Sequence, residues 1–246
     1  MKKKISEVVR HHLEDVIDLA STAVFLLLFI VGFYALFDIH YVRVSAKMDD
    51  EIITLAPDDN KEVDFNELHK INPEIKAWLK INNTGIDYPV VQTSDNTKYL
   101  TRNYRGDFAT AGSIFVDYRN HGFKDDFTLI YGHRMDGKLM FGGIASFEQK
   151  DYFDSHEKGV LYTEDATYDL EIMDYAVIDV NRATIYNHED NLNGKNDVII
   201  NEIHNYSRQS RYVEVKEKDK IIVLSTCDKD SKHYRNVILA KMIKRN

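Results

Sequence analysis

The chain has 246 residues, and 43% of them are hydrophobic, which is enough apolar material for a sizeable folded core. Its 40 acidic residues outnumber 32 lysines and arginines, for a formal net charge of −8, and no basic stripe interleaved with aromatic residues appears past residue 50. This balance excludes nucleic acid as an expected partner.

An apolar stretch without a charged side chain, LASTAVFLLLFIVGFYALF, occupies residues 19–37. It matches the roughly 20 residues that a helix needs to cross a bilayer, so we expect a transmembrane anchor. A cleaved signal peptide is the alternative, but its apolar region usually has about 7 to 15 residues, and here acidic residues such as Asp15 and Asp18 come before the stretch. Basic residues also gather before it, at residues 2–4 and Arg10, which favours a cytoplasmic N-terminus.

These signals predict a single-pass protein of the cell membrane whose folded body lies outside the cell. The expected regions, in chain order, are a cytoplasmic N-terminus at residues 1–18, the anchor at 19–37, a linker at 38–62 and an extracellular domain at 63–246. The linker ends in LAPDDNKE, where weak periodicity and many charges are typical of a tether.

The extracellular domain is predicted to be rich in strands. Two short helices are expected first, at residues 64–70, capped by Asp64, and at residues 73–79, with Pro73 in the first turn. Runs of β-branched and aromatic residues predict eight strands, at 86–91, 113–117, 127–131, 159–162, 168–179, 211–215, 220–226 and 236–243. A further helix is expected between the strands at 168–179 and 211–215, because Ile199, Ile203 and Tyr206 recur at helical spacing. So many strands with few helices predict a mostly β fold, either a barrel or a sandwich.

Cys227 is the only cysteine, which excludes an internal disulfide even in a compartment that would permit one. It follows the strand-forming run KIIVLST, and the next strand begins near Arg235. If the two strands pair as a hairpin, Arg235 lies beside the thiol, where a guanidinium can stabilise a thiolate or an oxyanion. His133 is the candidate proton donor, because it also follows an apolar strand, after a glycine that permits a sharp change of direction.

Each of these residues also has an ordinary explanation. A cysteine at a strand end is by default a small buried hydrophobe, while His133 and Arg235 fit a surface loop and a solvated charge. Their occurrence together in an oxidising compartment nevertheless indicates nucleophilic catalysis by a cysteine and a histidine.

We expect no cofactor and no metal. GHRMDGKL, at residues 132–139, has Leu139 where a phosphate-binding loop needs a hydroxyl that can ligate magnesium. DKDSKH, at residues 228–233, lacks the third ligand and the glycine of a calcium loop. The histidines show no spacing typical of zinc ligands.

LSTC at residues 224–227, followed by Arg235, together with YGH at 131–133, resembles the signature of the sortases, membrane-anchored cysteine transpeptidases of Gram-positive bacteria. Longer segments are similar to the class B members in particular, and the resemblance covers roughly residues 65 to 244. These segments are NPEIKAWLKINNTGIDYPVVQTSDNTKYL (72–100), GSIFVDYRN (112–120) and MFGGIASFEQKDYFDSHEKGVLYT (140–163).

The resemblance implies an eight-stranded β-barrel with Cys227, His133 and Arg235 at the end of a groove. It implies that Cys227 attacks a Thr carbonyl in the C-terminal sorting signal of a surface protein and forms a thioacyl-enzyme, while His133 protonates the departing amine. An amine of a peptidoglycan precursor or of a pilin then accepts the protein. Arg235 is expected to hold the oxyanion or the substrate backbone, with the backbone amide of Asp228 as a second donor.

The class B pattern also implies substrate-binding residues, although less firmly. These are Asn96, Leu100, Tyr131, Ser225 and, by a looser match, Tyr186. Asn96 is expected to anchor a peptide amide, and the apolar members to pack against side chains of the signal. An ordinary core position is the alternative for Leu100.

Two other functions remain open on the sequence alone. A cysteine endopeptidase would use the same site, with water in place of an amine as the acceptor of the acyl group. A non-catalytic surface-binding domain would use Cys227 only as buried filler, so thiol alkylation would leave its activity intact.

Overall fold

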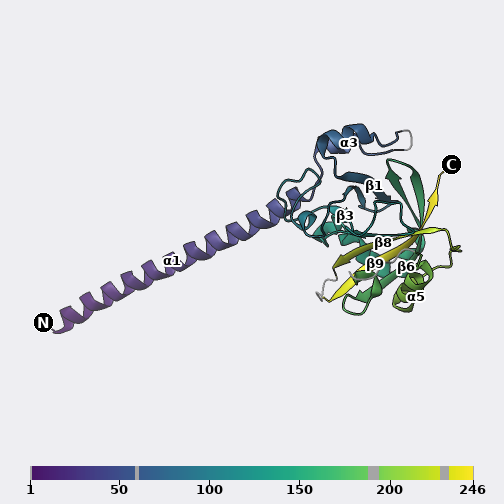
Figure 1. Cartoon of the computed structure of the whole chain (residues 1–246). Helices are drawn as coiled ribbons and strands as arrows, with labels where there is room; N and C mark the ends of the chain where they lie inside the picture. The colour runs from purple at the N-terminus through teal and green to yellow at the C-terminus, as the bar shows by residue number, and fades with distance from the viewer. Residues whose placement is uncertain (1, 59–60, 188–193, 228–232, 246) are drawn as a thin grey trace. The chain divides into compact units, whose positions relative to one another are not determined.

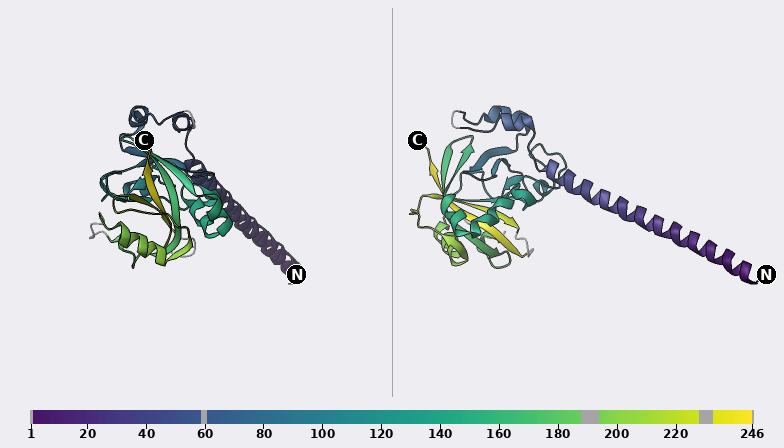
Figure 2. Two further views of the ribbon diagram at one scale, coloured as in Figure 1. Left: turned by 90° about the vertical axis from the view of Figure 1, so that its right-hand side faces the viewer. Right: turned by 180° about the vertical axis from the view of Figure 1, so that it is seen from behind.

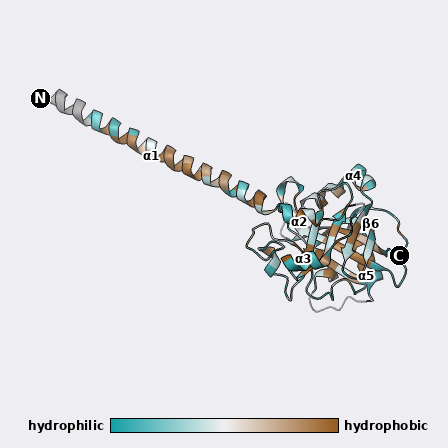
Figure 3. Cartoon of the chain, turned by 90° about the horizontal axis from the view of Figure 1, so that it is seen from above, coloured by the Kyte–Doolittle hydropathy of each residue, from teal (hydrophilic) through white to brown (hydrophobic). Residues whose placement is uncertain are grey.

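The computed structural model of the chain describes residues 2–58, 61–187, 194–227 and 233–245 (Figure 1). It divides into two compact units, Met1–Val44 and Ser45–Asn246. Helix α1, Lys2–Ser45, makes up nearly all of the first unit, and its central part is strongly apolar (Figure 3).

α1 is long and apolar enough to cross a membrane. Its most apolar window of 18 residues has a mean hydropathy of 2.4, and none of that window is buried within the protein. The hydroxyls of Ser21 and Thr22 donate to the carbonyl of Asp18 at 2.9 and 2.8 Å, so they are satisfied within the helix itself. By length and composition α1 fits either a membrane anchor or a signal sequence.

The second unit is a mixed β-barrel. Its strands are β1 (Ile75–Ile81), β2 (Asp87–Val91), β3 (Ile114–Val116), β4 (Phe127–Tyr131), β5 (Lys158–Thr163), β6 (Thr167–Asp179), β7 (Ser207–Ser210), β8 (Lys220–Cys227) and β9 (Tyr234–Lys244). They run in the order β5-β1-β2-β3-β4-β8-β9-β6-β7, and an additional pairing of β5 with β6 closes eight of them into a barrel. β2 with β3 and β4 with β8 are parallel pairs, and the other pairs are antiparallel. The predicted eight-stranded barrel is therefore confirmed.

Short helices surround the barrel. They are α2 (Asp50–Thr54), α3 (Phe65–Ile71), α4 (Lys150–Ser155) and α5 (Asn196–Asn205), with 3₁₀ turns η1 (Lys98–Leu100), η2 (Asp136–Lys138), η3 (Gly142–Glu148) and η4 (Thr184–Tyr186). α3 and α5 lie on different sides of the barrel (Figure 2). α5 follows β6 and precedes β7, as predicted, and the side chain of Asp64 caps α3 by accepting from the amides of Asn66 and Glu67.

Both faces of the central strands are buried, which explains why β8 is apolar along most of its length. Ile222 and Leu224 belong to the cluster that fills the barrel, whereas Ile221 and Val223 pack with Ile199 of α5 on its outside. A third cluster contains Trp78 of β1 together with residues of α2 and α3.

Two predicted elements are wrong. Residues 73–79 form no helix, because the chain from Ile75 to Ile81 is strand β1, which pairs with β2 and β5. Its lysines, alanine and leucine favour a helix in isolation, but burial in the barrel wall overrides that preference. Residues 211–215 are not a strand either: the neighbouring strand β7 covers Ser207–Ser210, and the ladder to β6 ends after the amide of Arg211 donates to Met173 at 2.8 Å.

The stretch that was expected to be a linker contains α2. Ile52 of α2 is fully buried in the same cluster as Trp78, and the side chain of Asp49 caps the helix by accepting from the amide of Ile52 at 3.0 Å. Arg105 donates to Asp49 at 2.9 Å, and this hydrogen bond lowers the pKa of Asp49 to about 2. Residues near 50 are thus folded onto the barrel.

Candidate active site

The strand pairing brings the predicted catalytic positions to one end of the barrel. β4 and β8 are parallel, and Tyr131 pairs with Ser225. His133 and Cys227 each come two residues after this pair, so their backbones lie at the same end of the two strands. The amide of Gly132 donates to the carbonyl of Ser225 at 3.1 Å and continues this pairing. β8 and β9 are antiparallel, with Cys227 opposite Arg235, which is the hairpin register that the sequence predicted.

His133 is held by the backbone of another segment. Its Nε2 lies 2.7 Å from the carbonyl oxygen of Leu100. Because a carbonyl only accepts, Nε2 must carry the proton, which leaves Nδ1 as the basic nitrogen of the neutral ring. Gly112 makes this contact possible: it has φ +62°, and a Cβ there would lie 2.8 Å from the Leu100 oxygen and 3.0 Å from Cδ2 of His133.

A cavity of about 260 Å³ opens at the same end of the barrel. All five predicted substrate-binding residues line it, together with His133 and Arg235. The described lining residues are Asn96, Leu100, Phe115, Tyr131, Gly132, His133, Val180, Tyr186, Ser225, Thr226 and Arg235. The cavity therefore combines apolar and aromatic walls with a few polar groups, the composition typical of a ligand site.

Hydrogen bonds fix several of the lining side chains. The hydroxyls of Tyr186 and Ser225 lie 2.7 Å apart, which joins η4 to β8. Tyr131 donates to Oδ2 of Asp117 at 2.9 Å, and burial together with the nearby charge of Asp117 raises the pKa of this tyrosine. Tyr131 is therefore a neutral hydrogen-bond donor at physiological pH.

Asn96 is held in place by the protein itself. Its Nδ2 donates to Asp117 at 3.1 Å, and its Oδ1 accepts from the amide of Tyr118 at 2.9 Å. The structure brings Asn96 to the cavity wall, and each end of its side-chain amide makes one hydrogen bond to the protein, which leaves one N–H and one oxygen lone pair for a peptide.

One predicted residue is not described by the structure, and three residues at or behind the cavity wall were not predicted. Asp228, the predicted oxyanion donor, falls outside the described residues. Thr226 lines the cavity but was not predicted, although a polar residue within an apolar run was the available signal. The acidic and basic side chains of FVDYRN, Asp117 and Arg119, are also absent from the prediction, and only their position directly after an apolar strand could have indicated them.

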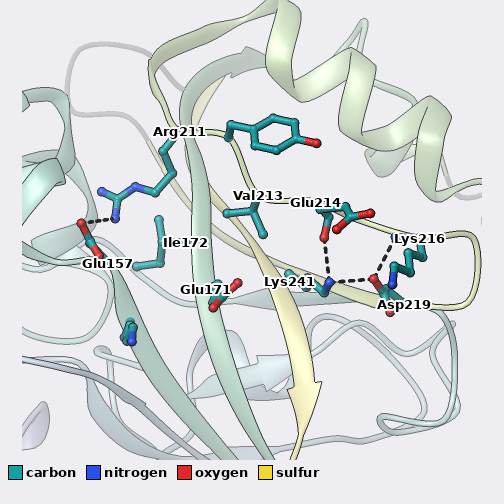
Figure 4. A pocket seen from close by; sticks show the side chains of 11 residues that line it. Glu157, Glu171, Ile172, Arg211, Val213, Glu214, Lys216, Asp219 and Lys241 are labelled. Carbon is teal, nitrogen blue, oxygen red and sulfur yellow. Dashed lines mark hydrogen bonds and ion pairs between the residues drawn. The ribbon is translucent and has the colours of Figure 1, made fainter.

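A larger cavity, about 510 Å³, lies against β6, β9 and the segment 211–219 (Figure 4). Two ion pairs lie among its charged side chains: Arg211 lies 3.3 Å from Glu157, and Lys241 lies 2.7 Å from Asp219. Lys241 is six residues beyond Arg235 on β9, so the two cavities are separated by about 20 Å along the strand.

The sequence matches the family described as Sortase domain over residues 79–243. It is 35% identical to sortase B of Listeria monocytogenes over 190 residues, which cover 73% of this chain and 74% of that protein. The chain therefore belongs to the sortase family, within its class B, and is a cysteine transpeptidase by that membership.

Solved structures agree with this assignment. A class B sortase of Streptococcus pyogenes, described as involved in pilus biogenesis, has a TM-score of 0.66 at 31% identity and covers 73% of this chain and 98% of that one. A sortase B–substrate complex of Staphylococcus aureus has a TM-score of 0.66 at 29% identity and covers 74% and 85%.

Proposed function

We propose that Cys227 is the nucleophile of a transpeptidation reaction on the C-terminal sorting signal of a surface protein. The observation that carries this proposal is the strand register, in which Cys227 pairs with Arg235, a residue that lines the same cavity as His133. Class B membership supports the reaction type, and the Staphylococcus aureus relative is described as a complex with substrate.

The reaction proceeds in two acyl transfers. The thiolate of Cys227 attacks the carbonyl carbon of a Thr, and the C–N bond of the peptide breaks as His133 gives its Nδ1 proton to the departing amine. Arg235 and the amide of Asp228 hold the negative charge that develops on the carbonyl oxygen. An incoming amine then attacks the thioester, loses a proton to His133, and releases Cys227 with a new amide bond.

The walls of the cavity supply substrate binding. Leu100, Tyr131 and Tyr186 offer apolar and aromatic surface for side chains of the signal, and the hydroxyl of Ser225 offers a polar contact. The accepting amine belongs to a peptidoglycan precursor or to a pilin. The pilin is supported by the Streptococcus pyogenes relative, which is described as acting in pilus biogenesis.

α1 acts in this proposal as a single-pass membrane anchor at residues 19–37, with residues 1–18 in the cytoplasm and the catalytic domain, residues 63–246, outside the cell. Its length and hydropathy support the anchor, and the basic residues before the apolar stretch support the orientation. N-terminal sequencing of the protein extracted from membranes tests it: a mature chain that starts after Ala46 identifies the segment as a signal peptide.

Product analysis tests the reaction itself. The full-length chain in detergent is incubated with a panel of Thr-containing signal peptides, with and without a candidate amine, and the products are identified by mass spectrometry. We expect a new amide that contains the amine, and no product from Cys227→Ala. Hydrolysis alone at saturating amine identifies an endopeptidase, and turnover by Cys227→Ala overturns the mechanism.

A further inference from the structure

Asp117 is a buried carboxylate behind the wall of the active-site cavity. Its side chain is only 1% exposed, and it is not among the described lining residues. Two residues that do line the cavity donate to its Oδ2: Tyr131 through its hydroxyl at 2.9 Å and Asn96 through Nδ2 at 3.1 Å. One carboxylate oxygen thus fixes side chains from two separate segments of the wall.

Arg119 extends this arrangement to a third segment. Its Nε and Nη2 donate to Oδ1 and Oδ2 of Asp117 at 2.8 and 2.9 Å, the bidentate geometry that favours arginine over lysine. Its Nη1 donates to the carbonyl of Asn187 at 2.7 Å, and its Nη2 to that of Ile185 at 3.0 Å. These two carbonyls flank Tyr186, the η4 residue that lines the cavity and contacts Ser225.

The two side chains depend on each other's charge. Burial acts to raise the pKa of Asp117, but the hydrogen bonds and charge of Arg119 outweigh it, so that the pKa lies below its ordinary value. Desolvation likewise acts to lower the pKa of Arg119, and Asp117 more than compensates. Both groups are charged at neutral pH, and removing either leaves the other buried without its partner.

We propose that Asp117 and Arg119 are positioning residues that hold three segments of the cavity wall, those of Asn96, Tyr131 and Tyr186, in the arrangement that binds the substrate peptide. The inference rests on the proposed function of the cavity. Because the pair lies behind the wall, its loss acts on peptide binding rather than on the acyl-transfer chemistry, and the effect appears in KM more than in kcat.

Arg211 provides a matched control, because it is the same kind of residue but lines the larger cavity (Figure 4). Its side chain is 19% exposed, against 17% for Arg119. It also pairs with a carboxylate, that of Glu157 at 3.3 Å, and donates to a backbone carbonyl, that of Phe153. A purely structural arginine should therefore behave like Arg211 when changed to lysine.

The experiment compares Arg119→Lys with Arg211→Lys in the full-length chain in detergent. Amide hydrogen exchange of residues 184–187 reports whether Arg119 holds this segment, and it needs no substrate. KM and kcat are measured with the peptide of the panel that the wild type cleaves fastest. For Arg119→Lys we expect exchange about tenfold faster in this segment and a KM about tenfold higher, with kcat changed less than about twofold. For Arg211→Lys we expect neither effect, whatever its thermal stability.

A KM for Arg119→Lys within about twofold of the wild type, unchanged exchange at residues 184–187, or an equal KM change in Arg211→Lys each overturns the inference. If Arg119→Lys does not fold, Tyr131→Phe replaces it, because it removes only the hydroxyl that binds Asp117. A KM unchanged in that variant also overturns the inference. Failure of the proposed function is distinguishable, because the wild type itself then forms no transpeptidation product.

Discussion

The two ends of the barrel each have a cavity, but they use polar side chains differently. At the end that contains Lys241, the cavity of about 510 Å³ is lined mostly by charged groups, and four of these form two ion pairs. At the end that contains His133, the cavity of about 260 Å³ has mostly apolar and aromatic walls, with an arginine and a histidine at strand ends. Volume alone would select the larger cavity, whereas the chemistry of the lining residues favours the smaller one, the proposed active site.

Strand topology accounts for this difference. The parallel pairing of β4 with β8 places the residues that follow Tyr131 and Ser225 at one end of the barrel. The antiparallel β9 starts at that same end, and Arg235 is its second residue. At the opposite end, the register sets Lys241 beside Glu171 and near Asp219, so that opposite charges meet. If catalysis is confined to the end that contains His133 and Arg235, substitutions there should reduce activity, and substitutions at the end that contains Lys241 should not.

The largest effect is expected from Cys227→Ala. Because the thiolate is the proposed nucleophile, turnover should fall by at least about 10³-fold. Circular dichroism and the melting temperature should be unchanged, since the substitution removes a single sulfur atom. Lys241→Met, at the other end of the barrel, is the control and should keep the kcat/KM of the wild type. Equal activities of Cys227→Ala and the wild type would remove the cysteine from the mechanism.

Arg235→Lys should have the next largest effect. Lysine keeps the positive charge but lacks the planar pair of donors that can hold a developing oxyanion. We expect kcat to fall by about 10² to 10³, the usual cost of losing an oxyanion donor. The measurement is single-turnover acylation of the thiol by the signal peptide. A Lys variant that acylates as fast as the wild type would mean that only the charge of Arg235 matters.

Gly112→Ala is expected to have an intermediate effect, through the position of His133. The added Cβ would lie 2.8 Å from the Leu100 oxygen that accepts from Nε2, so the ring must shift and kcat should fall about tenfold. Gly106→Ala is the matched control: its φ is also positive, at +92°, but a Cβ there meets nothing within 4 Å. Backbone strain should cost each variant about 1 kcal/mol of stability. Gly112→Ala should lose more than that, because its Cβ would also lie 2.6 Å from the backbone oxygen of Tyr99, and only Gly112→Ala should lose activity.

The positions of the catalytic candidates could be predicted because each stands next to an apolar run in the sequence. Cys227 and His133 follow such runs, and Arg235 begins the next one, so hairpin pairing alone was enough to join the cysteine with the arginine. Bringing His133 to the same end required the parallel register of β4 and β8, for which no local signal exists. There the family resemblance supplied what the residues could not.

The errors of the sequence prediction also have physical causes. Residues 73–79 contain good helix formers after a proline, and only the pairing with β2 and β5 makes them a strand. Asp117 and Arg119 are two residues apart in sequence, but their role depends on carbonyls of Ile185 and Asn187, which lie far along the chain. Local sequence identifies such residues only as charges in a loop.

Lys241→Met should give the smallest effect, one on stability alone. Lys241 donates to Asp219 at 2.7 Å and to the carbonyl of Glu214, also at 2.7 Å, with a side chain only 15% exposed. We expect a loss of about 1 kcal/mol at neutral pH, since partly buried pairs exceed surface pairs only modestly. Lys158→Met, an exposed lysine on the same cavity, is the control and should change nothing.

The pH dependence identifies the source of that loss. The backbone amide of Lys216 and then the side chain of Lys241 lower the pKa of Asp219, so the folded state holds its proton less tightly than the unfolded state does. Because the pKa of Asp219 is lower in the folded state, its ionised form stabilises the fold at pH values above the ordinary aspartate pKa, which is about 4. This stabilisation is lost as the pH falls toward the pKa of the folded state. The difference in melting temperature between wild type and Lys241→Met should therefore shrink below about pH 4. A difference that stays constant from pH 7 to pH 2.5 would assign the loss to the Glu214 carbonyl instead of the ion pair.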